Sequence, residues 1–98
     1  MNFKNFTIKS QEAVQKAQQL AMENGQQAIE TGHLLKAIFE VDENVSPYLF
    51  QKLGVNLTNV VQALDRIVTG YPKVSGGDAY LSRSANTVLQ KANSYLKS

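Results

Sequence analysis

Apolar residues recur at helical spacing along most of this chain, and residues that begin or end helices bound each run. The first run follows Thr7, whose hydroxyl is suited to accept hydrogen bonds from the free amides of a first helical turn. Gly25 is expected to end this helix, because glycine adopts a left-handed conformation at little cost. The predicted buried face consists of small and aliphatic residues: Ala13, Val14, Ala17, Leu20 and Ala21.

A second helix is predicted to begin with Thr31 as its cap and to end at the sequence DEN, residues 42–44. Its predicted buried stripe contains Leu34, Leu35, Ile38 and Phe39. A short third helix should follow, with Ser46 as its cap and Pro47 at its first position, where the missing N–H of proline is harmless. Gly54 is expected to end it.

A fourth helix is predicted after a cap at Asn56 or Thr58, and Gly70 should end it. Its apolar positions are Leu57, Val60, Val61, Leu64, Ile67 and Val68. The next segment, YPKVSGGDA at 71–79, has a proline, a glycine pair and no apolar period, which is typical of a loop.

The last helix is predicted to be capped by Ser82 and runs to residue 98 without a stop signal, so the sequence looks cut. Its apolar positions are Ala85, Val88, Leu89, Ala92 and Leu96. Residues 6–20 and 81–95 share an apolar residue, a hydroxyl cap and a helix of the same phase. This similarity predicts a repeat of about 75 residues with four helices in each unit, unless two short amphipathic helices match by chance.

Composition and charge narrow the possible classes of protein. With 98 residues, of which 43% are hydrophobic, the chain is at most one small globular domain. It has no apolar run long enough to span a membrane, no secretory signal and no cysteine, which fits a reducing cytoplasm. Basic residues dominate after residue 60, yet the net charge of only +2 falls short of the dense basic stripe expected for nucleic-acid binding.

Motifs for catalysis are missing, and His33 is the single candidate imidazole. The chain has no phosphate-binding loop and no zinc-protease or serine-hydrolase motif. His33 is placed in the first turn of a helix, where the helix dipole disfavours an imidazolium ion. It is therefore interpreted as hydrogen-bonded to a neighbouring group, while catalysis is the less favoured alternative. Metal binding is disfavoured because no second histidine or acidic cluster lies three or four residues away.

Four segments together resemble the N-terminal domain of the Clp ATPases. They are FTIKSQEAVQKAQQLAMENG, IETGHLLKAIFE, LFQKLGVN and YPKVSGGDAYLS, and they occur in the order typical of that family. The connector PKVSGG…YLS favours the ClpB-type protein disaggregases within it. The resemblance implies an all-α fold with a first four-helix repeat at 1–70, a connector at 71–80 and the first helix of a second, truncated repeat at 81–98.

The resemblance also implies a function without catalysis. Such domains are mobile attachments of a hexameric, ATP-driven ring and bind unfolded or aggregated polypeptides in an apolar groove, so ATP and magnesium are expected only in ATPase domains absent from this chain. By position, Thr7 and Leu89 correspond to substrate contacts, and we add Tyr80 and Leu81 at the start of the last helix. Leu89 also fits the buried stripe, so both groove and core remain possible roles.

Gly32 departs from the family pattern, because relatives usually carry glutamate before the histidine. In the protease-associated relatives that carboxylate helps to bind phosphorylated arginine, so the resemblance implies no such ligand here. The last helix either packs on the first four or leaves an apolar face exposed through which the fragment would self-associate. Alternative functions are adaptor docking, as in protease-associated Clp proteins, and, more distantly, nucleic-acid binding.

Overall fold

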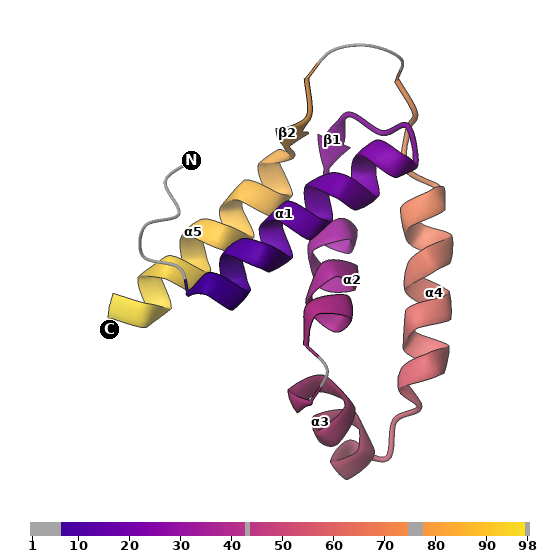
Figure 1. Ribbon diagram of the computed structural model, residues 1–98, viewed down its shortest axis with the longest axis vertical. Helices are drawn as coiled ribbons and strands as arrows, with labels where there is room; N and C mark the ends of the chain where they lie inside the picture. Colours follow the sequence, from indigo (N-terminus) through magenta and orange to yellow (C-terminus); the bar gives the residue numbers. More distant parts are fainter. Residues whose placement is uncertain (1–6, 43, 75–77, 98) are drawn as a thin grey trace.

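The computed structural model describes residues 7–42, 44–74 and 78–97, and helices account for most of them. Figure 1 shows the order of the elements along the chain. They are α1 (Ile8–Glu23), β1 (Ala28–Ile29), α2 (Thr31–Val41), α3 (Val45–Leu53), α4 (Leu57–Thr69), β2 (Tyr80–Leu81) and α5 (Arg83–Lys97). The predicted all-α class is confirmed, while the predicted division into repeats stays a prediction.

Helix α2 lies at the centre of the fold and contacts α1, α4 and α5. Helix α3 packs only loosely against α4 and lies at the opposite end of the molecule from the strands (Figure 1). None of the α3 residues is buried. The stable part of the domain is therefore built around α2 and α1 rather than from four equivalent helices.

The sequence did not predict the short pair of strands. Strands β1 and β2 are parallel, with Ala28 opposite Tyr80 and Ile29 opposite Leu81. The backbone N–H of Tyr80 donates to Gln27 O at 3.0 Å, and that of Ser82 donates to Ile29 O at 2.9 Å. This pairing joins segments about 50 residues apart and fixes where α5 begins. Two residues per strand are too few to show an alternating pattern in the sequence.

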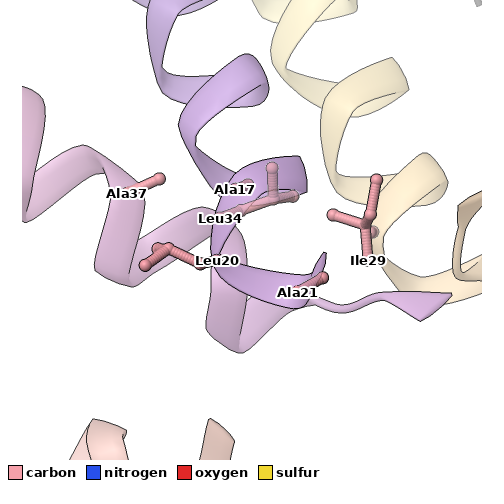
Figure 2. Packing of buried hydrophobic residues seen from close by; sticks show 7 residues of the cluster. Ala17, Leu20, Ala21, Ile29, Leu34 and Ala37 are labelled. Atoms are coloured by element: carbon pink, nitrogen blue, oxygen red, sulfur yellow. The ribbon is translucent and has the colours of Figure 1, made fainter. Parts of the chain in front are cut away.

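Small side chains let the central helices approach closely. Figure 2 shows the buried cluster from close by. Its members are Ala17, Leu20, Ala21, Ile29, Leu34, Ala37 and Ala85. Val14, Ala79, Leu81 and Leu89 are partly buried and pack against this cluster. The predicted face of α1 is thus confirmed, with Val14 at its edge.

The predicted stripe of α2 is wrong at two positions. Leu35 is 42% exposed and Ile38 44% exposed, whereas Leu34 is buried. On α4, Ile67 is likewise exposed, and only Leu64 and Val68 are buried. Apolar spacing identifies the helix correctly, but it does not tell which apolar residues have a neighbouring helix to cover them.

Helix α5 packs on the core, yet part of its apolar surface is exposed, so it shows features of both predicted arrangements. Ala85 is buried in the core and Leu89 packs against it, so α5 does join the first four helices. Val88, on another face of the same helix, is 49% exposed. Self-association through this helix stays a prediction.

Most of the predicted helix ends are confirmed. Thr7 Oγ1 accepts from the Ser10 amide at 3.1 Å, Asn56 Oδ1 from Asn59 at 3.3 Å, and Ser82 Oγ from Ala85 at 3.0 Å. Asn56, rather than Thr58, is thus the cap of α4. Gly25 and Gly54 have φ of 68° and 72°, the left-handed conformation expected after a helix.

Two predicted caps are wrong. Thr31 is the first helical residue of α2, and Glu30 occupies the N-cap position in extended conformation. The start of α3 is held by Asp42 rather than by Ser46. Its carboxylate accepts from the amides of Asn44, Val45 and Ser46 at 3.1, 2.9 and 2.8 Å, and from the Ser46 hydroxyl at 2.7 Å. The carboxylate accepts more donors than a serine hydroxyl could, and negative charge is favoured at a helix N-terminus.

The pH dependence of unfolding should reveal the contribution of Asp42. Hydrogen bonds from the Ser46 hydroxyl and from the α3 amides lower the pKa of the Asp42 carboxyl from its ordinary 3.8 to about 2. The unfolded state then binds the proton more readily than the folded state, so this stabilisation is complete above about pH 5 and is lost as the pH falls toward 2. The difference in unfolding free energy between the wild type and Asp42→Asn should shrink over that acidic range in urea titrations. An NMR titration of the Asp42 carboxyl with an ordinary midpoint would contradict this prediction.

Candidate functional site

His33 is completely buried where the end of α1, the start of α2 and the end of α4 meet. Its Nδ1 accepts from the Glu30 backbone N–H at 2.9 Å, so this nitrogen carries no proton. Its Nε2–H donates to Gln26 Oε1 at 2.6 Å. Both ring nitrogens therefore have partners inside the protein, as expected for a structural histidine.

Gln26 extends this hydrogen-bond network to α4. Its side chain is buried, and Nε2 donates to the carbonyl oxygens of Val68 at 2.6 Å and of Tyr71 at 3.3 Å. These carbonyls lie at and just after the end of α4, and the Val68 carbonyl also accepts from the Tyr71 N–H at 3.2 Å. The amide side chain thus satisfies a helix end and fixes the neutral tautomer of His33.

Gln26 and Glu30 are partners of His33 that were not predicted from the sequence. Glu30 lies three residues before His33, the spacing of a capping box in which the side chain at the third helical position bonds back to the cap amide. That spacing is a signal the sequence does contain. The hydrogen bond from Gln26 to Val68 joins residues 42 positions apart in the chain, and no local sequence pattern predicts it.

Gly32 is buried against Tyr71. A β-carbon at residue 32 would lie 2.6 Å from the Tyr71 hydroxyl oxygen, closer than real side chains allow. The Gly32 N–H donates to that hydroxyl at 3.3 Å, and the Tyr71 ring packs on His33 with ring centroids 5.2 Å apart. Close approach, rather than an unusual backbone conformation, is the physical reason for glycine at this position.

The residues predicted to bind substrate lie in two groups. Tyr80 and Leu81 line a hollow of about 360 Å³ between α1 and the start of α5, here called the β2 groove. Its lining residues are Val14, Gln18, Ile29, Ala79, Tyr80, Leu81 and Asn86. Tyr80 is 55% exposed, whereas Leu81 is partly buried against the core. The groove therefore has an apolar floor and an accessible aromatic edge.

Thr7 and Leu89 do not line the β2 groove. Thr7 is exposed at the N-terminus of α1, and its hydroxyl also donates to Ser10 Oγ at 3.0 Å. Leu89 is partly buried against the core cluster, which agrees with the core role left open by its helical phase. Their predicted contacts with substrate stay predictions.

Among the residues that the structure describes, no group of three or more His, Cys, Asp or Glu is placed to hold a metal ion. Within the same described ranges, no helix combines the length and apolar character that crossing a membrane requires.

The stability of the domain should depend on the neutral state of His33. Burial lowers the pKa of His33 below its ordinary value of 6.5. Below that pH the unfolded chain takes up a proton that the folded state excludes, so the stabilisation is complete above about pH 6.5 and decreases on acidification. Urea unfolding at about pH 7.5 and 5.5 should show a larger loss for the wild type than for His33→Gln, which does not titrate. Equal losses in the two proteins would contradict a buried neutral histidine.

A double-mutant cycle tests the contact between Gly32 and Tyr71. Gly32→Ala should destabilise the wild type despite the better helix propensity of alanine, because the new methyl group collides with the Tyr71 hydroxyl. In the Tyr71→Phe background that oxygen is gone, and the cost of Gly32→Ala should fall by about 1 kcal/mol in urea unfolding. Gly70→Ala is the control, since its β-carbon would meet backbone oxygens of α4 at an ordinary 3.4 Å. Additive effects of Gly32→Ala and Tyr71→Phe would rule out the proposed collision.

Comparisons with known proteins identify the family of this chain. Residues 5–98 match the family described as the Clp repeat (R) N-terminal domain. The chaperone protein ClpB of Bacteroides thetaiotaomicron is 56% identical over 97 residues, which cover 99% of this chain and 11% of that protein. ClpB of Porphyromonas gingivalis is 49% identical over 92 residues, 94% of this chain and 11% of that protein.

More distant relatives carry the same name. The chloroplastic chaperone protein ClpB3 of Arabidopsis thaliana is 33% identical over 94 residues, 94% of this chain and 10% of that protein. The chain thus spans about a tenth of the length of the curated relatives it matches. Because the family match covers almost all of its residues, the chain belongs to the family of Clp repeat N-terminal domains, which are non-catalytic, and is similar to those of ClpB chaperones.

Proposed function

We propose that this domain binds exposed hydrophobic segments of unfolded or aggregated polypeptides on behalf of a ClpB-type, ATP-dependent protein disaggregase. The observation that carries the proposal is the 56% identity to a chaperone protein over nearly the whole chain. The β2 groove supports it, because the groove offers apolar side chains next to the exposed ring of Tyr80. A tyrosine at a groove edge gives a large contact area at low cost in side-chain entropy.

The chemistry of this groove suits a promiscuous and weak interaction. The β2 groove has few polar groups, Gln18 and Asn86 among them, so it should distinguish little between clients of different sequence. Contact with a few apolar side chains at a time should give micromolar or weaker affinity, about 8 kcal/mol or less of binding free energy. Weak binding allows a client to be released to the parts of the chaperone that act on it.

In this proposal the domain itself performs no catalysis. ATP and magnesium would bind to the ATPase domains of a full-length ClpB-type protein, which would work as a hexamer in the cytoplasm. Several weak domains on one assembly would raise the effective concentration of binding sites for an aggregate that carries several exposed segments.

Titration of fluorescently labelled unfolded casein with this domain tests the proposal. Tyr80→Ser should weaken binding by about fivefold, since it removes the exposed aromatic edge of the β2 groove. Tyr48→Ser is the matched control, because Tyr48 is 57% exposed but lies on α3, away from the groove. Equal weakening by both variants would show that casein has no preference for the β2 groove.

A second variant decides the role of Leu89. Leu89→Asp places a carboxylate beside the core, so circular dichroism must first show that the variant is folded. If the folded variant binds casein as the wild type does, Leu89 is a core residue and not part of the binding site. A loss of binding in the folded variant would assign Leu89 a contact with the client.

A further inference from the structure

Helix α1 ends in the dipeptide Asn24-Gly25, the one place in the sequence where glycine follows asparagine. The backbone nitrogen of the residue after an asparagine can attack the side-chain amide carbon, and a following glycine has no β-carbon to hinder this approach. Every other asparagine of the chain precedes a residue with a side chain. Reactivity toward this ring closure is therefore concentrated at Asn24.

The reaction at this dipeptide needs water as its only co-reactant. Gly25 N forms a bond to Asn24 Cγ while the Cγ–Nδ2 bond breaks, and the leaving nitrogen takes up the Gly25 N–H proton and departs as ammonia. Water then opens the cyclic imide. Its attack at Cγ leaves aspartate, whereas its attack at the main-chain carbonyl carbon leaves isoaspartate, whose main chain is longer by a methylene group.

The fold holds Asn24 in a conformation that opposes this attack. The attacking group is engaged, because the Gly25 N–H donates to Met22 O at 3.0 Å. The leaving group is engaged as well, because Asn24 Nδ2 donates to Leu20 O at 2.9 Å. The ψ angle of Asn24 is 5°, which places the Gly25 nitrogen beside the Asn24 backbone nitrogen rather than beside its β-carbon. Ring closure therefore requires this turn to open.

Further hydrogen bonds keep the turn closed. Gly25 has a φ of 68°, and the Gln26 N–H donates to Ala21 O at 2.8 Å, the pattern of a Schellman motif. The Gly25 carbonyl oxygen accepts from the Val74 N–H at 3.0 Å, which ties the turn to the segment after α4. The Gln26 side chain is buried and bonded to His33. The contacts that protect Asn24 thus come from residues of this domain itself.

We propose that Asn24 is a self-modification site that the fold keeps inactive, and that it converts to aspartate or isoaspartate only in molecules whose turn after α1 has opened. Opening frees the Gly25 N–H and lets the ψ angle of Asn24 rotate. Because the loss of ammonia is irreversible, each conversion is a permanent record of one opening event. The proposal concerns the fold alone and does not depend on the proposed binding of unfolded clients.

The modified turn cannot close as before. A carboxylate at residue 24 has no N–H for Leu20 O, and its negative charge is unfavourable at the C-terminus of a helix. Isoaspartate also lengthens the main chain just before Gln26, whose side chain bonds to both His33 and Val68 at 2.6 Å. Such short bonds leave little room for a shifted backbone, so modification should loosen the buried network.

Ageing of the whole chain in a mildly alkaline buffer tests the proposal. Mass spectrometry of digests locates the change from amide to acid, and enzymatic methylation detects isoaspartate. Asn24 in the folded chain should convert at least about tenfold more slowly than in a free peptide of residues 18–30. Equal rates in the chain and the peptide would overturn protection by the fold.

Asn44 is the internal control for reactivity, because it is exposed but precedes Val45. In the chain unfolded in urea, Asn24 should convert much faster than Asn44. Equal rates at the two asparagines would overturn the assignment of the site to Asn24.

Matched variants of Val74 test the route through opening. Val74→Pro removes the N–H that donates to Gly25 O and should raise the rate at Asn24 about fivefold. Val74→Ala keeps this N–H and should match the wild type. Both changes lie far from Asn24 in the sequence, so they leave its intrinsic reactivity unchanged. An unchanged rate in a Val74→Pro variant that circular dichroism shows to be folded would overturn the proposed route.

Urea below the unfolding midpoint gives the same test without a substitution. It should raise the rate at Asn24 in the chain progressively and leave the rate in the free peptide unchanged. This series decides the question if Val74→Pro does not fold. A rate in the chain that stays constant up to the midpoint would overturn the proposal.

Asn24→Asp tests the consequence of modification. It should have a lower unfolding midpoint in urea than Asn24→Ala, since both lose the bond to Leu20 O but only aspartate adds charge at the end of α1. Equal midpoints would overturn the proposed effect of the new carboxylate.

Discussion

The architecture of this domain depends on the buried hydrogen bonds that join Gln26 to His33 and to the end of α4. Leaving one buried polar group of this network without a partner would cost about 1–3 kcal/mol of stability. The hydrogen bonds of the network are therefore kept or lost together. The network fixes the turn after α1, and β1 follows directly from that turn. Because β1 pairs with β2, the same network also determines where α5 begins and hence the shape of the β2 groove.

Local chemistry explains why much of the fold could be predicted. The caps at Thr7, Asn56 and Ser82 act within three residues, so their signals are complete in a short stretch of sequence. The predictions were wrong where two nearby residues could each cap the same helix, as at Asp42 and Glu30. In both cases an acidic residue just before the predicted cap takes the place of the expected hydroxyl residue. Asp42 does so through hydrogen bonds to its charged side chain, and Glu30 through its extended backbone conformation.

Contacts between distant segments could not be predicted from local patterns. The pairing of β1 with β2 and the bond from Gln26 to Val68 both join segments more than 40 residues apart. Exposure is equally non-local: Ile67 and Val68 are both apolar neighbours on α4, yet only Val68 has a covering partner. Tyr80 and Leu81 meet in one groove because strand pairing places them beside α1, while Thr7 and Leu89 lie elsewhere.

Helix α3 shows that the elements of this small domain contribute unequally to its stability. It contributes no buried residue, and apart from its contacts with α4 and the edge-to-face packing of Phe50 on Phe39 it is held mainly through Asp42. Substitutions on its outer surface therefore leave the core intact. Among the described helices α3 alone has no buried residue, so its outer surface can change its side-chain chemistry at little cost in stability.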